Sequence, residues 1–82
     1  MAAMLEIDAR HLLCPMPVIR LQDAVAQLEP GQHVVLVATD PGVQQDVPAW
    51  CRMHGHEIVS CDQDASGEWR LEVRLVAAAT DA

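Results

Sequence analysis

The sequence contains no lysine, and its five arginines stand against 12 aspartates and glutamates. The formal charge of −7 provides no basic surface with which to hold a phosphate backbone. Phenylalanine and tyrosine are also absent, so the rings on which single-stranded bases usually stack are limited to two tryptophans. We therefore expect no direct binding to nucleic acid. The acidic charge keeps a small domain soluble, and it also suits docking on a basic protein partner.

Long apolar runs are missing as well. No segment approaches the ~18 apolar residues of a membrane span, and the sequence does not open with a basic segment followed by an apolar one. The three cysteines, at positions 14, 51 and 61, are an odd number without the close pairing of a disulfide-stapled secreted domain. We expect a cytoplasmic protein with free thiols and no membrane association.

The 82 residues are enough for one domain with a small aliphatic core. We expect residues 1–76 to form it and residues 77–82 to be a disordered tail. Apolar periodicity predicts strands at 4–8, 33–39, 56–61 and 69–75, the second of them central and the last two a hairpin, and a helix over about 14–28.

The segment 43–54 also reads as helical, but Pro48 argues against one uninterrupted helix. We expect one short turn and then a helix with Asp46 as its N-cap and Gly55 as its C-terminal cap. The order β-α-β-α-β-β predicts an α/β fold of the α+β kind. In such a two-layer sandwich, two helices cover one face of a four-stranded sheet.

Cys14 is the residue that points most clearly to chemistry, because it stands where a helix begins. Pro15 and Pro17 support that position, since proline costs little in a first helical turn. The partial positive charge at a helix N-terminus stabilises a thiolate there. The setting favours a reactive thiol over a buried structural cysteine.

Two other uses of Cys14 are weaker. A hydrolase would need a histidine base, for which His11 is in range, but the sequence offers no assignable group to orient it. A thiol reductase would need a resolving cysteine beside Cys14, and none is there. The thiol is more consistent with carrying a group than with hydrolysis, and a scaffolding module that merely packs Cys14 is the competing interpretation.

Several charged residues are candidates for supporting roles. Arg10 flanks the cysteine, and a guanidinium within reach would lower its pKa further. Arg20 is expected to face solvent or a partner. Asp40 and Asp46 have ordinary explanations as turn and cap residues, and the alternative is that they shape the rim beside Cys14 or meet a partner.

A metal site is a separate possibility, because sulfur and imidazole ligands suit zinc. The residues concerned are Cys51, His54, His56 and Cys61. Their spacing matches no standard finger, so we expect no metal, with Cys51 in the core and Cys61 in strand packing or on the surface.

The sequence resembles the TusA/SirA sulfur-carrier family. The resemblance extends from about residue 5 to 75, and its most specific part is the Cys-Pro-x-Pro helix start. It rests on Cys14-Pro15-Met16-Pro17, preceded by Asp8 and Leu12 and followed by Pro30-Gly31, Asp40-Pro41, Asp46 and Gly55-His56-Glu57.

The resemblance implies a mixed four-stranded sheet, in a fold similar to the C-terminal domain of translation initiation factor 3. It implies that Cys14 carries sulfur as a persulfide, received from a cysteine desulfurase or a rhodanese-type donor and relayed to an acceptor protein. The pathways implied are tRNA thiolation, molybdenum-cofactor enzymes and sulfur oxidation. No metal or organic cofactor is needed, and a monomer is expected. Whether such a relay counts as catalysis is left open.

The sequence departs from the family at two positions. Where relatives usually have glycine, just ahead of Leu12, this chain has His11. If that glycine supplies a positive φ, histidine can adopt it at some cost, and His11 then alters the turn or tunes the thiol. Met16 occupies a position that is often acidic or otherwise variable in relatives, which bears on the choice of partner.

Overall fold

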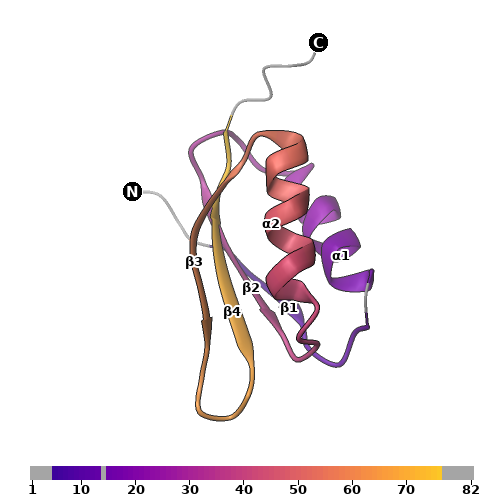
Figure 1. Cartoon of the computed structure of the whole chain (residues 1–82). Coiled ribbons are helices and arrows are strands. Elements are labelled where there is room, and N and C mark those ends of the chain that lie inside the picture. The colour runs from indigo at the N-terminus through magenta and orange to yellow at the C-terminus, as the bar shows by residue number, and fades with distance from the viewer. Residues whose placement is uncertain (1–4, 14, 77–82) are drawn as a thin grey trace.

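The computed structural model describes residues 5–13 and 15–76. Within them the elements follow the predicted order (Figure 1). They are β1 (Leu5–Ala9), α1 (Met16–Val25), β2 (His33–Ala38), α2 (Val43–His54), β3 (Glu57–Gln63) and β4 (Trp69–Arg74). Both helices lie on the same side of the sheet, which makes the two-layer α+β sandwich expected from the sequence (Figure 1).

The sheet is mixed, with strand order β1-β2-β4-β3. β1 runs parallel to β2, with Ile7 opposite Leu36, and β2 runs antiparallel to β4. β3 and β4 form the predicted antiparallel hairpin, which has a register shift between Ile58 and Ser60. β2 is therefore a central strand, as its nearly continuous apolar run indicated. The carboxyl ends of β1 and β2 meet at one edge of the sheet, from which the loops to both helices leave.

The core is aliphatic and lies between the sheet and the helices. Its fully buried residues include Leu21 of α1, Val47 of α2 and Leu36 of β2, with Trp50 as the one large aromatic residue. Because phenylalanine and tyrosine are absent, branched side chains fill this layer. The close fit of the helices to the sheet determines where their N-termini lie.

The opposite face of the sheet carries ion pairs rather than a second layer. Val35 and Val37 of β2 are buried there, although no helix covers them. The Arg70 guanidinium on β4 reaches across β2 to the Glu6 carboxylate on β1, at 3.6 Å. Long charged side chains thus shield this face. Neither helix in the described residues is long and apolar enough to cross a membrane.

The prediction for segment 43–54 was wrong in one respect. α2 is a single helix from Val43 to His54 with Gly42 as its N-cap, so Asp46 lies inside the first turns and Pro48 in the helix interior. The apolar face explains this result, because Val43, Val47 and Trp50 are all buried by one continuous helix. Packing of that face outweighs the hydrogen bond that Pro48 cannot donate.

Other boundaries differ by a few residues. α1 ends at Val25, and the amides of Gln27 and Leu28 make tighter bonds to the Ala24 and Val25 carbonyls, both 3.0 Å. Gly55 ends α2 with φ of 80°, as expected for a C-terminal cap. The predicted tail, residues 77–82, lies outside the described residues and stays a prediction.

Candidate functional site

The loop that approaches Cys14 leaves the end of β1 through a left-handed residue. His11 has a φ of 65°, which is the positive φ that glycine would supply at this position in relatives. Its backbone N–H donates to Thr39 Oγ1 at 2.9 Å, and the Leu12 N–H donates to the Ala9 carbonyl at 3.4 Å. The loop is thus held to the end of β2 and turns back toward α1.

Arg10 fixes the start of this loop through two carboxylates. Its Nε donates to Glu68 Oε2 at 2.9 Å, and a terminal nitrogen lies 3.2 Å from Asp8 Oδ1. The hydrogen bond to Glu68 is the main factor that raises the pKa of Arg10. The Arg10 backbone N–H, bonded to Asp8 Oδ1, is the main factor that lowers the pKa of Asp8. The guanidinium is therefore committed to these partners, and its predicted influence on Cys14 stays a prediction.

Cys14 itself lies outside the described residues, but its neighbours define a surface setting. Leu13 is 73% exposed and Pro15, the N-cap of α1, is exposed too. The Met16 N–H donates to the Leu13 carbonyl at 2.7 Å, and Pro17, buried in the first turn, has no N–H. Of the first two amide positions of α1, one is therefore bonded and the other has no N–H.

An apolar groove lies beside Pro15, between the start of α1 and α2. Its volume is about 280 Å³, and it is lined by Pro15, Val18, Asp46, Ala49, Trp50 and Met53. Met53 is 80% exposed, and Met16 and Ile19 on α1 are exposed apolar residues as well. Apolar side chains that remain accessible next to a candidate reactive residue are suited to contact with another protein.

Asp40 and Asp46 are brought together at the start of α2. A Cβ built on Gly42 would lie 3.0 Å from Asp40 Oδ2 and 3.6 Å from Asp46 Oδ2, so both carboxylates flank this glycine. Acidic groups at this end of a helix are favoured by its dipole. Asp46 also lines the groove beside Pro15. The structure therefore places Asp46 on the rim of the groove near Pro15. Asp40 lies beside Gly42 and does not line the groove.

The other two thiols occupy different environments. Cys51 is buried in the core, and burial raises its pKa to about 11. Cys61 is exposed on β3, where partial burial and then the neighbouring Asp62 raise its pKa. The described residues contain no group of three or more histidine, cysteine or acidic side chains placed to hold a metal ion. His56, one of the predicted ligand candidates, accepts a hydrogen bond from the Val76 amide instead.

Sequence reasoning missed three residues around this site. Thr39 holds the His11 amide, Glu68 binds Arg10, and Met53 forms part of the groove. The first two act across 28 and 58 residues of sequence, and no local pattern marks such contacts. Met53 could have been found by its spacing, since it follows Trp50 by three positions on the same helix.

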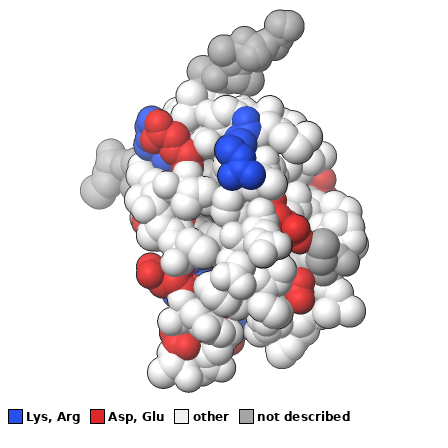
Figure 2. Space-filling model, viewed as in Figure 1, with Lys and Arg blue, Asp and Glu red and all other residues white. Residues whose placement is uncertain are grey.

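The charge distribution agrees with the composition. Figure 2, which has the same viewpoint as Figure 1, shows scattered acidic side chains and no extended basic area on this face. Basic groups in the described residues are largely paired with acids, as in the Arg74–Glu57 and Arg10–Glu68 ion pairs.

Comparison with known proteins agrees with the fold and the motif. The chain is 41% identical over 59 residues to the sulfur carrier protein TusA of Pseudomonas aeruginosa, covering 72% of this chain and 75% of that protein. It is 42% identical over 53 residues to YrkI of Bacillus subtilis, covering 65% and 71%. The crystal structure of a SirA-like protein from Desulfitobacterium hafniense superposes with a TM-score of 0.80 at 26% identity, covering 89% of this chain and 99% of that one.

The comparison with family profiles covers more of the chain than the two sequence relatives do. The profile described as sulfurtransferase TusA matches residues 5–75, which include all six elements and the loop before α1. The match thus spans the left-handed turn at His11, the Cys14-Pro15-Met16-Pro17 helix start and both helices. This chain therefore belongs to the TusA family of sulfur carriers.

Proposed function

We propose that the protein carries sulfane sulfur as a persulfide on Cys14 and relays it from a donor protein to an acceptor protein. The observation that carries the proposal is the family's Cys-Pro-x-Pro helix start, whose cysteine is flanked by exposed Leu13 and Pro15. The two other thiols are poorer candidates, because Cys51 is buried and burial also raises the pKa of Cys61.

The transfer conserves atoms and electrons without a cofactor. The Cys14 thiolate attacks the outer sulfur of a donor persulfide, a new S–S bond forms, and the bond to the donor's own sulfur breaks. The donor leaves as a thiolate, and Cys14 now bears the persulfide with its proton. An acceptor thiolate then attacks that outer sulfur and releases the Cys14 thiolate.

The surroundings of Cys14 support both steps. The α1 dipole favours a negative charge at the helix start, whether on the thiolate or on the persulfide. Pro15 and Pro17 keep the helix start rigid, since each has a fixed φ. The loop that leads to Cys14 is anchored by Thr39 and Glu68.

The surface supports exchange between protein partners. The groove beside Pro15, together with exposed Met16 and Ile19, supplies apolar contact area. The formal charge of −7 would attract a partner with a basic surface. Suitable donors are a cysteine desulfurase or a rhodanese-type protein in the cytoplasm, and suitable acceptors act in tRNA thiolation, molybdenum-cofactor or sulfur-oxidation pathways.

The direct test is intact-mass spectrometry after incubation with a cysteine desulfurase and L-cysteine. We expect a mass increase of one sulfur atom, mapped to the peptide that contains Cys14, and no increase in Cys14→Ser. Cys61→Ser is the matched control and should load as wild type does, because Cys61 is exposed but distant in the sequence from the motif.

A thiosulfate-fed rhodanese provides the second donor. Loading of Cys14→Ser to the wild-type level by either donor would overturn the assignment of Cys14. Failure of the wild type to load from both donors would instead favour a non-redox scaffolding module with the same fold.

A further inference from the structure

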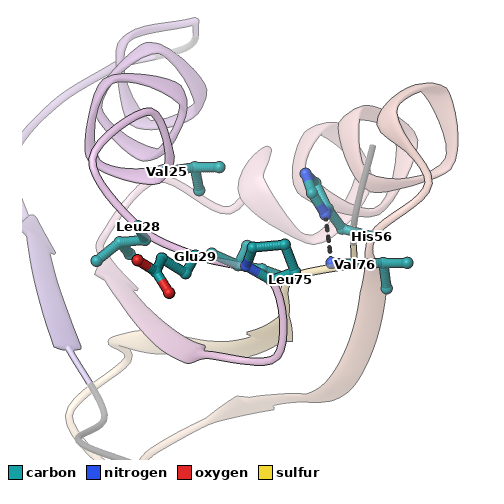
Figure 3. Close-up of a pocket in the computed structure, with 7 residues that line it drawn as sticks. Val25, Leu28, Glu29, His56, Leu75 and Val76 are labelled. Atoms are coloured by element: carbon teal, nitrogen blue, oxygen red, sulfur yellow. Dashed lines mark hydrogen bonds between the residues drawn. The ribbon is translucent and has the colours of Figure 1, made fainter. Parts of the chain in front are cut away.

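A second cavity lies at the end of the molecule where both helices finish, away from the start of α1 (Figure 3). Its volume is about 270 Å³. It is lined by Val25, Leu28, Glu29, Pro30, His56, Leu75 and Val76. His56 is the one residue in this lining whose ordinary pKa lies near neutral pH. Nothing in the sulfur chemistry proposed above uses it.

The His56 ring is held in place by the end of α2. Gly55 adopts a left-handed conformation, and the His56 backbone N–H donates to the Cys51 carbonyl at 2.9 Å. The ring centroid then lies 5.2 Å from that of Trp50 and 6.5 Å from that of His54. The side chain is half-buried and cannot turn freely without losing the contact with Trp50.

His56 connects this helix end to the end of β4. The Val76 N–H donates to His56 Nδ1 over 3.0 Å, as the dashed line in Figure 3 marks. The preceding residue, Leu75, is bonded to the other side, with its N–H on the Gln32 carbonyl and its carbonyl on the Gly31 N–H. Val76 is thus bonded to the residue that follows the end of α2, whereas Leu75 is bonded to the loop before β2.

This hydrogen bond fixes the protonation state of the ring. Nδ1 can accept the Val76 N–H only when it carries no proton, and an imidazolium has a proton on both nitrogens and no acceptor. We propose that His56 is a proton-operated latch: neutral His56 holds Val76 against the end of α2, and protonation of His56 releases it.

Three titratable residues lie near His56, and none of them is an acidic group free to hold its proton. His54, on α2, is the nearest titratable ring. Glu29 lines the same cavity, but in Figure 3 its carboxylate points away from His56 at the opposite end. Glu57, the next residue on β3, is bonded to Arg74 Nε at 3.0 Å. Leu75 and Val76 carry no charge.

The direction of the pH response follows. Burial and then the charge of His54 lower the pKa of His56 from its ordinary value of 6.5. Because the unfolded chain binds this proton more readily, the contribution of neutral His56 to stability is complete above about pH 6.5 and is lost as the pH falls through the lower folded value. The latch is closed at neutral pH and opens in mild acid.

NMR spectroscopy of the whole chain tests the latch directly. The ring ¹⁵N shifts of His56 report its tautomer, and we expect Nε2 to carry the proton at pH 7.5. Amide exchange, corrected for the intrinsic rate at each pH, reports the Val76 bond. We expect Val76 protection to fall roughly five- to tenfold with the same midpoint as the His56 titration, the change that loss of one hydrogen bond produces. Leu75, which bonds to Gln32, is the internal control and should keep its protection.

Two variants distinguish the effect of protonating His56 from the effect of its ring packing on Trp50. His56→Asn keeps an acceptor oxygen near the position of Nδ1 but does not titrate, so Val76 should stay protected in mild acid. His56→Phe keeps a ring beside Trp50 but has no acceptor, so Val76 should be unprotected at every pH.

The latch is excluded if wild-type Nδ1 carries the proton at pH 7.5, or if Val76 protection is unchanged through the His56 midpoint. The tautomer measurement needs no variant and remains decisive even if His56→Phe does not fold. None of these readouts depends on Cys14 or on sulfur loading.

Discussion

The His11 backbone amide donates a 2.9 Å hydrogen bond to Thr39 Oγ1, which joins the loop after β1 to the residue that follows β2. Ala9 and Ala38, the last residues of these two strands, are paired in the parallel register. The loops that follow β1 and β2 therefore leave the sheet at the same end, and the Thr39 hydroxyl links them. The position of the loop before Cys14 depends on this link.

Replacement of Thr39 by valine tests the link, because valine has the same shape but no hydroxyl. The His11 amide would lose its partner, and we expect the free energy of unfolding to fall by about 0.5–1 kcal/mol, at the low end of the hydrogen-bond range because the site is exposed. Urea denaturation measures the change. Thr39→Ser keeps the oxygen and should recover most of the loss; equal destabilisation by serine would show that the hydroxyl is not the cause.

His11 carries a conformational cost that glycine would remove. At a φ of 65° a side chain costs about 1–2 kcal/mol, of which part is offset by the greater freedom of glycine in the unfolded chain. We expect His11→Gly to raise the free energy of unfolding by up to about 1 kcal/mol. His11→Ala retains a Cβ and should give no gain, so a similar gain from alanine would show that the imidazole, and not the backbone, is responsible.

The parts of this fold that local physics decides could be predicted from the sequence. The left-handed conformation of Gly55 follows from its place directly after a helix. The positive φ of His11 was considered only because relatives have glycine at that position. The β3–β4 hairpin and the central position of β2 follow from apolar patterning. The burial of Cys51 follows from its place on the apolar side of a helix.

The parts that failed depend on contacts between distant residues. Asp46 and Pro48 looked like the start of a helix, and only the packing of Val43 and Val47 on the sheet shows that the helix begins earlier. The effect of Arg10 on Cys14 stays a prediction, but the hydrogen bond from Arg10 Nε to Glu68, 58 residues away, could not have been foreseen. The sequence contains no local signal for such a pairing.

Pro48 therefore lies in the interior of α2, and its effect on the free energy of unfolding can be measured. Pro48→Ala restores an N–H that can donate to the Gln44 carbonyl in the preceding turn. The interior penalty is about 3 kcal/mol, from which the lost rigidity of the unfolded chain subtracts somewhat less than 1 kcal/mol. Allowing for local adjustment already made in α2, we expect a gain of about 1–2 kcal/mol in urea denaturation.

A glycine at the same position provides the control for Pro48. Pro48→Gly also restores the N–H but is the poorer helix former by about 1 kcal/mol, so it should gain correspondingly less. If both variants are less stable than wild type, the packing of the Pro48 ring stabilises α2 by more than the missing hydrogen bond costs, and the proline carries no net penalty.

The three thiols should react in a definite order with iodoacetamide near neutral pH. With a pKa of about 11, Cys51 is ionised to only roughly one part in ten thousand at pH 7, and it is buried as well. Cys61 also has a raised pKa, but because it is exposed it should react faster than Cys51. We expect Cys14 to react first and to keep its lead at pH 6, as peptide mapping over time would reveal. Labelling of Cys61 ahead of Cys14 would contradict an activated thiol at the start of α1.

Met53 tests whether the groove beside Pro15 is where a sulfur donor docks. It is 80% exposed, so Met53→Ala should leave the unfolding midpoint unchanged, while a partner that covers this side chain would lose apolar contact. We expect the apparent KM for sulfur loading from a competent donor to rise roughly fivefold, the equivalent of about 1 kcal/mol. Val59→Ala is the matched control, because Val59 is 49% exposed on β3, away from the groove. Equal effects of the two variants on KM would move the docking surface elsewhere, whereas an effect confined to Met53 would place the donor against α2 and the start of α1.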